Sequence, residues 1–245
     1  TNHWGVRGAA GGAVALIPHS VDAAIGREAL ASIDGELMTP SKLPPEQQQT
    51  LRAAFERAVA ALPAGSVPPH ELLFRASKVG PNAFALPGGS IILTDELVQL
   101  VGSDEQVITG VLAHELGHVR HRHGMRAVVQ VTALGAVASL VVGDFSGLLA
   151  GVPALLGQAG YSRDAEREAD AEAVSTLRAA GISPRVMVRF FERIVQWREE
   201  EAQGDKKSGD KESQGDPADS WLGIAIASHP ADAERIRFFE NAARP

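Results

Sequence analysis

Cysteine is absent from this 245-residue chain, and its absence excludes both disulfide bonds and metal sites built from thiolates. The chain also lacks any run of basic residues, and its formal net charge is −7. A nucleic-acid partner is therefore not expected, because phosphate backbones are bound through clusters of lysine and arginine. Hydrophobic residues make up 44% of the sequence, which is enough to build one sizeable core.

The sequence shows no internal repeat and no signal-peptide pattern, so it predicts one domain with a smaller N-terminal extension. We expect residues 1–45 to form an arm that packs on or near a domain spanning residues 46–245. The chain begins at Thr1 rather than methionine, and we interpret it as a fragment whose natural start was removed. Residues 201–220 are rich in Gly, Asp, Lys and Ser without periodicity, which predicts a mobile loop.

Residues 127–160 form an unusually apolar segment, with no basic residue and only Asp144 among the acids. Gly143 and Asp144 divide it into two pieces, each shorter than the roughly 20 residues that a bilayer span requires. We therefore expect a pair of buried or interfacial helices, which could also cover a cleft as a lid. Contact with a membrane surface through this segment is an alternative.

The segment His114-Glu115-Leu116-Gly117-His118 contains two histidines four residues apart. On a helix this spacing places both imidazoles on one face about one turn apart, so both can reach the same ion. Glu115 follows about a third of a turn round, close enough to contact a water molecule held by that ion. This H-E-x-x-H arrangement is typical of zinc peptidases, in which the carboxylate takes the proton of the water.

The residues around the motif predict a buried helix. Ser103 and Gln106 have the spacing of a capping box at its start, and Gly124 is suited to end it. From Val107 to Val119 the chain is apolar nearly all round. Histidine and glutamate side chains buried there need partners, because an unpaired charge in a core costs several kcal/mol. A zinc ion would satisfy all three together.

The third ligand is predicted from a second helix, which we expect to run from Ser162 to Ala180. Glu166 and Asp170 lie one turn apart on a face that becomes apolar along the helix and therefore points inward. We assign Glu166 as the third ligand. Asp170 is placed to hydrogen-bond to a ligating histidine and to orient its ring.

The other carboxylates and histidines are interpreted differently. Glu168 and Glu172 lie on a polar face of the same helix, which we expect to be solvated. His121 is a rival ligand, because it follows His114 by seven residues on one helical face. The metzincin pattern does not fit, because its glycine and third histidine would stand in the reverse order. Four histidines without such a context are interpreted as surface groups: His3, His19, His70 and His123.

Three short strands are expected before the motif helix, at residues 72–76, 83–86 and 91–94. A Pro-Gly-Gly turn joins the last two. An edge strand beside a zinc helix could bind an extended peptide through main-chain hydrogen bonds, with little sequence preference. A purely structural hairpin fits the sequence equally well.

Four motifs in this order resemble one family of enzymes. They are residues 81–89, the H-E-L-G-H segment, residues 161–170 and Ser228-His229-Pro230. Together they look like the zinc metallopeptidases related to HtpX and the CAAX prenyl endopeptidases (metallopeptidase family 48), and most like the compact members of the bacterial envelope. The resemblance covers roughly residues 46–240. It implies a mainly helical α+β fold, a gluzincin-like domain with a small sheet before the zinc helix.

The resemblance also implies functional roles for named residues. It places one zinc ion per chain on His114, His118 and Glu166, with Glu115 as the base. It places a substrate-binding strand, made of Asn82, Ala83 and Phe84, at the rim of the cleft. His229 would come near the metal, either to stabilise the oxyanion or to fill the open coordination position. The alternative is a solvent-facing histidine at the start of a helix whose first residue is Pro230.

We therefore expect a zinc-dependent metalloendopeptidase. The family implies unfolded or misassembled proteins of the bacterial envelope as substrates, and a periplasmic, membrane-anchored full-length protein whose anchor has been removed here. One alternative is a chaperone-like binding module with a latent zinc site closed by His229 and a lid. Another is a membrane-surface protein that makes its contact through residues 127–160.

Overall fold

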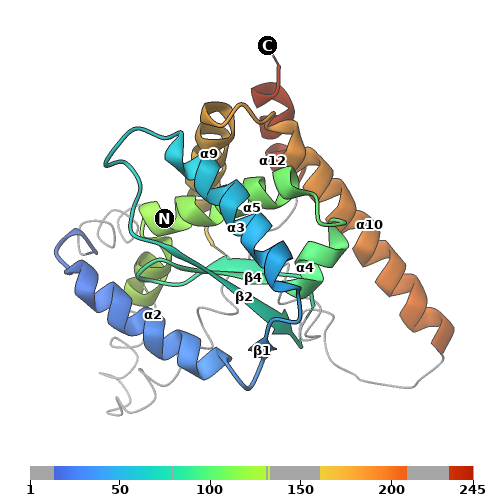
Figure 1. Cartoon of the computed structure of the whole chain (residues 1–245), viewed down its shortest axis with the longest axis horizontal. Helices are drawn as coiled ribbons and strands as arrows, with labels where there is room; N and C mark the ends of the chain where they lie inside the picture. The colour runs from blue at the N-terminus through green and yellow to red at the C-terminus, as the bar shows by residue number, and fades with distance from the viewer. Residues whose placement is uncertain (1–13, 79, 131, 133–160, 209–231, 245) are drawn as a thin grey trace, which may run out of the picture.

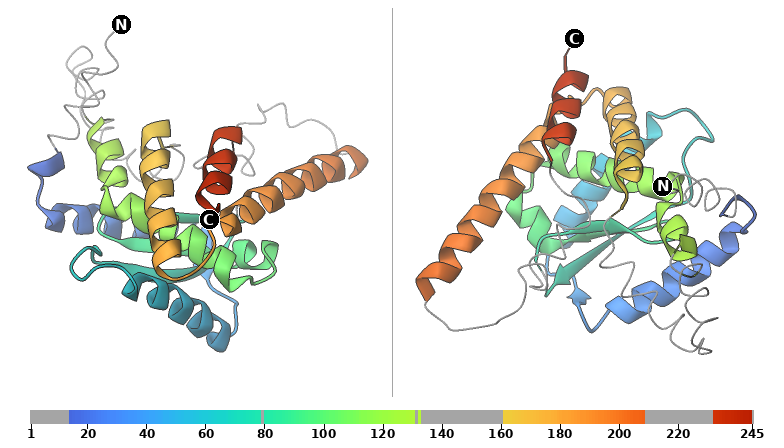
Figure 2. Two further views of the ribbon diagram at one scale, coloured as in Figure 1. Left: turned by 90° about the horizontal axis from the view of Figure 1, so that it is seen from above. Right: turned by 180° about the vertical axis from the view of Figure 1, so that it is seen from behind.

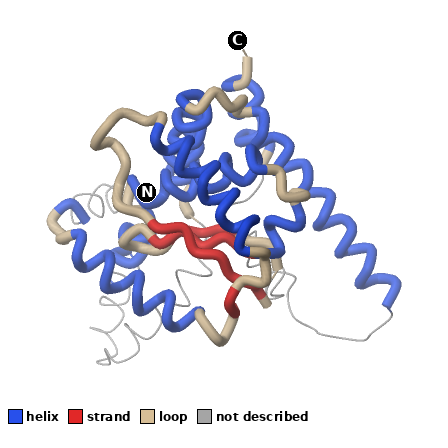
Figure 3. The backbone as a smooth tube through the Cα atoms, viewed as in Figure 1, coloured by secondary structure: helices blue, strands red, loops and turns tan. Residues whose placement is uncertain are grey.

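The computed structural model of the chain describes residues 14–78, 80–130, 132, 161–208 and 232–244. Within them the fold is mainly helical around one small sheet (Figure 3). The elements are α2 (His19–Ile33), β1 (Met38–Pro40), α3 (Pro45–Ala60), β2 (Glu71–Ser77), β3 (Ala83–Ala85), β4 (Ser90–Thr94), α4 (Asp95–Leu100), α5 (Glu105–Arg120), α9 (Arg163–Ala179), α10 (Arg185–Ser208) and α12 (Ala233–Ala242). The expected α+β fold, with a small sheet before the motif helix α5, is confirmed.

The sheet has the strand order β1-β2-β4-β3, so β3 lies at one edge. β2 and β4 are parallel, whereas β1 and β3 pair antiparallel with their neighbours. Successive side chains of a strand point to opposite faces, and in β4 Ile91 and Leu93 join the main core while Ile92 joins a smaller one. The sheet therefore separates two hydrophobic layers. The three strands expected before the motif helix are confirmed as β2, β3 and β4.

Helices cover both faces of the sheet (Figure 1). α3 and α5 supply Phe55 and Leu112 to the main core, whereas α2 supplies Ala29 and Ile33 to the smaller one. α9 packs along α5, and α10 contacts both α5 and α12 (Figure 2). α5 is thus enclosed between the sheet, α3, α9 and α10, which explains why every residue in 107–118 is buried.

The N-terminal region packs closely on the rest of the chain. Asp22 of α2 accepts two hydrogen bonds from Arg122, at 2.8 and 2.9 Å. Gly26 allows α2 to approach the sheet, because a Cβ at this position would lie 1.9 Å from the carbonyl oxygen of Pro87. β1 comes from the same region and pairs with β2. The residues expected to form an arm therefore contribute a helix and a strand, and the division at residue 45 stays a prediction.

The start of α5 differs from the sequence-based prediction. Asp104, not Ser103, caps the helix, and its side chain accepts hydrogen bonds from the backbone N–H groups of Gln106 and Val107. Ser103 has a φ of 61°, in the left-handed region, and belongs to the turn before the cap. The expected capping box was placed one residue too early.

Two later boundaries also differ. α10 continues to Ser208 and so occupies the first part of the loop expected at 201–220. Glu, Ala, Gln and Lys are common in this part, and their high helix propensity outweighs the lack of apolar periodicity. α12 begins after the cap residue Asp232, two residues beyond Pro230, which therefore does not open the helix. Residues 209–220 lie outside the described part of the chain.

Candidate metal centre

The motif helix α5 presents two imidazole rings on one face. His114 and His118 are buried, at 3% and 1% exposed, and their Nε2 atoms are 3.0 Å apart. Two imidazole nitrogens cannot face each other at this distance with only lone pairs between them. A proton or a metal ion must therefore lie between the two rings.

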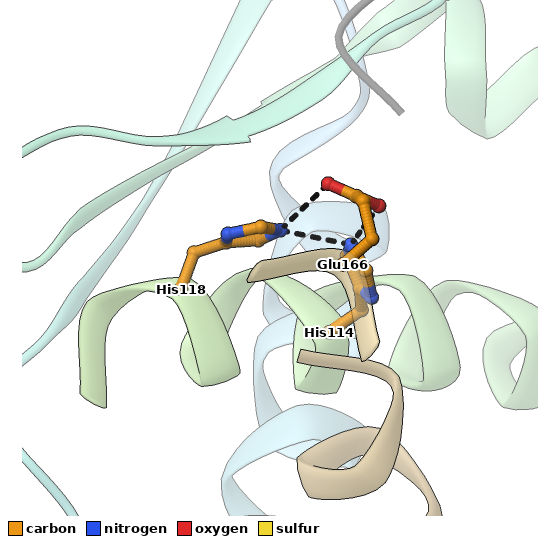
Figure 4. A group of neighbouring side chains, drawn as sticks. All are labelled: His114, His118 and Glu166. Carbon is orange, nitrogen blue, oxygen red and sulfur yellow. Dashed lines mark hydrogen bonds and ion pairs between the residues drawn. The ribbon is translucent and has the colours of Figure 1, made fainter. Parts of the chain in front are cut away.

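α9 brings Glu166 to the same point (Figure 4). Ser162 caps this helix by accepting from the N–H of Ala165 at 3.3 Å, which puts Glu166 in the first turn. A carboxylate is favoured there by the positive end of the helix dipole. Its two oxygens lie 3.5 Å from Nε2 of His114 and 3.5 Å from Nε2 of His118.

These separations fit a metal ion of the size of zinc. Zinc bonds to nitrogen and oxygen of about 2.0–2.2 Å, in a tetrahedral site, place ligand atoms about 3.3–3.6 Å apart. Each Nε2 atom lies 3.5 Å from a different carboxylate oxygen of Glu166, within this range, whereas the two Nε2 atoms are slightly closer together, at 3.0 Å. Two neutral imidazoles and one carboxylate also form a known donor set of catalytic zinc sites, which leaves a fourth position open.

The charges around His114 favour a cation. Burial lowers the pKa of its imidazole, but hydrogen bonds to Asp170 and Glu166 outweigh burial and raise the pKa to about 9. When no ion is bound, His114 is therefore protonated near pH 7 and its Nε2–H can donate to Nε2 of His118. A metal ion must displace this proton, and the same carboxylates would attract that ion.

Asp170 and Arg235 contact the proposed ligands His114 and Glu166. Asp170, one turn beyond Glu166, accepts from Nδ1 of His114 at 2.9 Å, which leaves Nε2 of that ring for a metal. Arg235 of α12 is only 6% exposed and pairs with both acids, at 2.8 Å to Glu166 and 2.6 Å to Asp170. Burial raises the pKa of Asp170, but hydrogen bonds from His114 and Arg235 lower it below its usual value.

Sequence reasoning did not identify Arg235 as part of this group. A signal was present, because Arg235 and Phe239 lie one turn apart and both are buried on one face of α12. An arginine on an otherwise buried helix face needs an acidic partner, since arginine is almost never fully buried unpaired. Its partner could not be named from sequence, because Asp170 stands 65 residues earlier in the chain.

Gly117 brings α9 close enough to α5 to deliver Glu166. A Cβ at this position would lie 2.9 Å from Cα of Ala169 and 3.1 Å from its carbonyl oxygen. Both atoms belong to the backbone of α9 and cannot move aside as a side chain can. The glycine inside the motif therefore sets the distance between the two helices.

Glu115, which is buried, and Tyr161, which is half-buried, lie beside these residues. Glu115 is 1% exposed and follows His114 on α5. The ring of Tyr161 stacks on that of His118, with centroids 4.0 Å apart and planes 20° apart. Burial raises the pKa of Tyr161, and the negative charges of Glu115 and Glu166 raise it further. The phenol of Tyr161 therefore stays protonated near pH 7.

A second group of histidines lies beside the first. His123 is 2% exposed. Its Nδ1 lies 2.8 Å from Nδ1 of His118, and its Nε2 lies 2.8 Å from Oε2 of Glu168. The expectation that His123 is a surface group is wrong, because a tight turn after α5 folds the chain back over His118. Burial lowers the pKa of His123 to about 4, so its ring is neutral near pH 7.

His121, the rival ligand, does not join His114, His118 and Glu166, since its Nε2 lies 3.1 Å from Glu172.

Residues 45–243 match the sequence profile of Peptidase family M48. The chain belongs to this family. The resemblance recognised from the four ordered motifs is thereby confirmed. Members of family M48 are metal-dependent peptidases, with zinc the usual metal, and the buried His-His-Glu group supplies ligands of the required kind.

Three relatives show the extent of the similarity. The beta-barrel assembly-enhancing protease of Escherichia coli (strain K12) is 30% identical over 129 residues, 46% of this chain and 26% of that protein. The mitochondrial metalloendopeptidase OMA1 of Arabidopsis thaliana is 29% identical over 163 residues, 66% of this chain and 29% of that protein. A protease HtpX homolog of Acidiphilium cryptum (strain JF-5) is 32% identical over 179 residues, 61% of each chain. The M48 chain thus spans about a quarter of the Escherichia coli protein.

The edge strand β3 lies against α5 in this M48 chain. Among the described strands it pairs only with β4, and Asn82, just before it, exchanges hydrogen bonds with Thr94. Ala83 and Ala85 point into the core, whereas Phe84 is half-buried on the opposite face. A cavity of about 430 Å³ lies beyond the end of this strand, with His118 in its lining.

The remaining expected features of the M48 chain cannot be placed from the described residues. His229 lies outside them, as do residues 131 and 133–160 of the apolar segment expected at 127–160. Among the helices that the structure describes, none combines the length and the hydropathy that crossing a membrane requires.

Proposed function

We propose that this M48 chain is a zinc-dependent metalloendopeptidase that binds one zinc ion through His114, His118 and Glu166. The observation that carries the proposal is the convergence of these three ligand groups, at separations of 3.0–3.5 Å, beside the buried Glu115. A zinc ion bound there would polarise the scissile carbonyl and acidify a water molecule.

The protein's own groups would then move the proton. The Glu115 carboxylate accepts it from the attacking water and later donates it to the leaving amine. Asp170 holds the proton of His114 on Nδ1, so that Nε2 keeps its lone pair. Tyr161 stays protonated and so cannot compete with Glu115 as a base.

We further propose that Asn82, Ala83 and Phe84 form the substrate-binding strand. Support comes from the position of β3 at the sheet edge, next to α5. A peptide added to this edge would be bound through its main chain, which suits substrates of varied sequence. The adjoining cavity, whose lining includes Leu86, Met125 and His118, offers space for an apolar substrate side chain.

The position of His229 in the chain supports a role at the metal. It precedes Asp232, the cap of α12, by three residues, and three extended residues span roughly 10 Å. α12 itself carries Arg235 into the site. If His229 fills the open coordination position, His229→Ala should raise cleavage of casein; if it stabilises the oxyanion, cleavage should fall by about 100-fold. Activity within twofold of the wild type would contradict both roles.

The biological setting is inferred from the relatives. The names of the Escherichia coli and Acidiphilium cryptum proteins, a beta-barrel assembly-enhancing protease and an HtpX homolog, favour quality control in a bacterial envelope. We propose unfolded or misassembled proteins as substrates, and a periplasmic location with membrane contact through residues 127–160 or an N-terminal anchor. Cleavage of a compact folded protein as fast as of casein would contradict this substrate preference.

Catalysis is tested by removing the base while keeping the metal. Glu115→Gln preserves the shape of the side chain but cannot accept a proton, so casein cleavage should fall by about 100-fold or more. Its zinc content should equal that of the wild type. Glu105→Gln, an exposed change on the same helix, serves as the control and should retain full activity. Wild-type cleavage by Glu115→Gln, with contaminating proteases excluded, would remove Glu115 from the mechanism.

A further inference from the structure

His118 is hydrogen-bonded through the ring nitrogen that points away from the proposed metal. Its Nδ1 lies 2.8 Å from Nδ1 of His123, and Nε2 of His123 lies 2.8 Å from Oε2 of Glu168. The rings of His118 and His123 meet at 70°, with centroids 4.9 Å apart. The three side chains thus form a continuous hydrogen-bonded chain from α9 to the proposed ligand.

With the ring of His123 neutral, hydrogen-bond chemistry permits one arrangement of protons along this chain. The Glu168 carboxylate only accepts, so Nε2 of His123 must carry a hydrogen. A neutral imidazole has one N–H, and Nδ1 of His123 is therefore bare and must accept from Nδ1 of His118. With its hydrogen on Nδ1, His118 keeps a lone pair on Nε2, the atom that faces His114 and Glu166.

The turn that carries His123 is held in a strained conformation. Arg122 has a φ of 53°, in the left-handed region, which costs about 1–3 kcal/mol for a residue with a side chain. Its guanidinium donates to Asp22 and to the carbonyl oxygens of Val14 and Ile17, at 2.7–2.9 Å. These bonds fix the turn and thereby place His123 against His118.

We propose that His123 and Glu168 are positioning residues for His118, fixing its tautomer and ring orientation for metal binding as Asp170 does for His114. The inference rests on the proposed function, because it requires a metal on His118. The ligand His118 would then be oriented by a carboxylate acting through a second histidine, rather than by direct contact. The lining of the cavity that contains His118 includes neither His123 nor Glu168.

The same side chains could instead form a second cation site, since ligand atoms of His121, His123 and Glu168 all lie within 4.8 Å of one another. Two contacts favour the positioning role. Arg126 donates to Oε2 of Glu168 at 3.1 Å and so already provides the positive charge. Nδ1 of His123 is occupied by the hydrogen bond to His118.

The test is the zinc affinity of the whole chain, measured by competition with a chelator at one pH. His123→Leu fills the space but cannot accept a hydrogen bond, and it should weaken zinc binding by about 10–100-fold. His123→Asn can place its amide oxygen near the former Nδ1 and should recover part of this loss. Glu168→Ala should weaken binding in the same direction, and its effect should not add to that of His123→Leu. Glu105→Gln, an exposed change at the start of α5, is the control and should remain within twofold of the wild type.

Two further measurements separate positioning from folding. The melting temperature of each zinc-free variant shows whether the fold is retained, and a purely structural role would lower it without changing the affinity. Nitrogen-15 spectra of the zinc-bound wild type should show the hydrogen of His118 on Nδ1.

The outcomes can be told apart. If the wild type binds one zinc ion and His123→Leu binds it equally well, the positioning role is wrong and the proposed function stands. If the wild type binds two zinc ions and His121→Ala binds one, the second histidine group is a metal site and the positioning role is again wrong. If the wild type binds no zinc, both proposals fail.

Discussion

Arg235 is the residue at which the proposed ligands meet the C-terminal helix. Its guanidinium contacts Glu166 at 2.8 Å and Asp170 at 2.6 and 2.7 Å, and it lies 4.9 Å from the ring centroid of Phe191. Two carboxylates buried this close together repel each other. The arginine offsets that repulsion and keeps both side chains aimed at the histidines.

Replacing Arg235 with methionine should therefore destabilise the protein. The change removes from two buried acids the guanidinium that pairs with both, and loss of one partner from a buried ion pair costs about 3–5 kcal/mol. Urea unfolding of the zinc-free protein measures the loss, and added zinc should restore part of it by supplying positive charge. Arg167→Met, which removes an exposed arginine paired with Glu234, is the control and should leave the unfolding midpoint unchanged. Equal midpoints for the two variants would contradict this role of Arg235.

Residue patterns predicted the site residues that share one helix better than the contacts between segments far apart in the sequence. The spacing of His114 and His118 follows from helix geometry alone, and the inward face of α9 pointed to Glu166. The environments of His123 and Arg235 depend on how distant segments pack, and no local pattern contains that information. The turn that buries His123 also requires a left-handed arginine, which is rarely expected from sequence.

At the scale of elements, the approach of α5 and α9 decides whether the ligands can share an ion. The two helices meet where Gly117 faces the backbone of Ala169. Gly110, two turns earlier on α5, faces side chains of α10 instead, with Sδ of Met187 at 2.8 Å and Cγ2 of Val186 at 3.0 Å from the position of an added Cβ. The same glycine-to-alanine change therefore has different consequences at the two positions.

Gly117→Ala should separate the helices and weaken zinc binding. Its Cβ would lie 2.9 Å from a backbone atom of α9, so the helix that carries Glu166 must move. We expect zinc affinity to fall by at least the 10–100-fold that follows loss of an orienting contact. Gly110→Ala has the same effect on helix propensity, but its neighbours are side chains of α10, Met187 and Val186, and not the backbone of α9, so its zinc affinity should stay near that of the wild type. If chelator competition gives the same affinity for both variants, close packing at Gly117 does not set the site.

The boundaries of α9 were predictable because cap residues mark both of its ends. Ser162 and Gly181 bracketed α9 correctly, because a side-chain cap and a left-handed glycine act locally. The end of α10 was misjudged, because polar composition suggested a loop although the residues favour a helix. The pairing of β1 with β2 was not foreseen, since a strand of three residues leaves almost no periodic signal.

At the scale of the molecule, the proposed metal would join parts of the chain that are far apart in sequence. α5 supplies two ligands, α9 supplies the third, and α12 holds that third ligand through Arg235. α2, through Asp22 and Arg122, fixes the turn that follows α5. The match to family M48 spans residues 45–243 and so includes α12 and both helices that carry the proposed ligands.

The central claim is that one zinc ion lies between His114, His118 and Glu166. Anomalous diffraction at the zinc edge, from crystals of the zinc-loaded chain, tests it most directly. One peak is expected, about 2.0–2.2 Å from Nε2 of each histidine and from a carboxylate oxygen of Glu166. In Glu166→Ala, prepared in the same way, the peak should be lost. A peak at His121, His123 and Glu168 in its place, or no peak near the motif helix, would contradict the account.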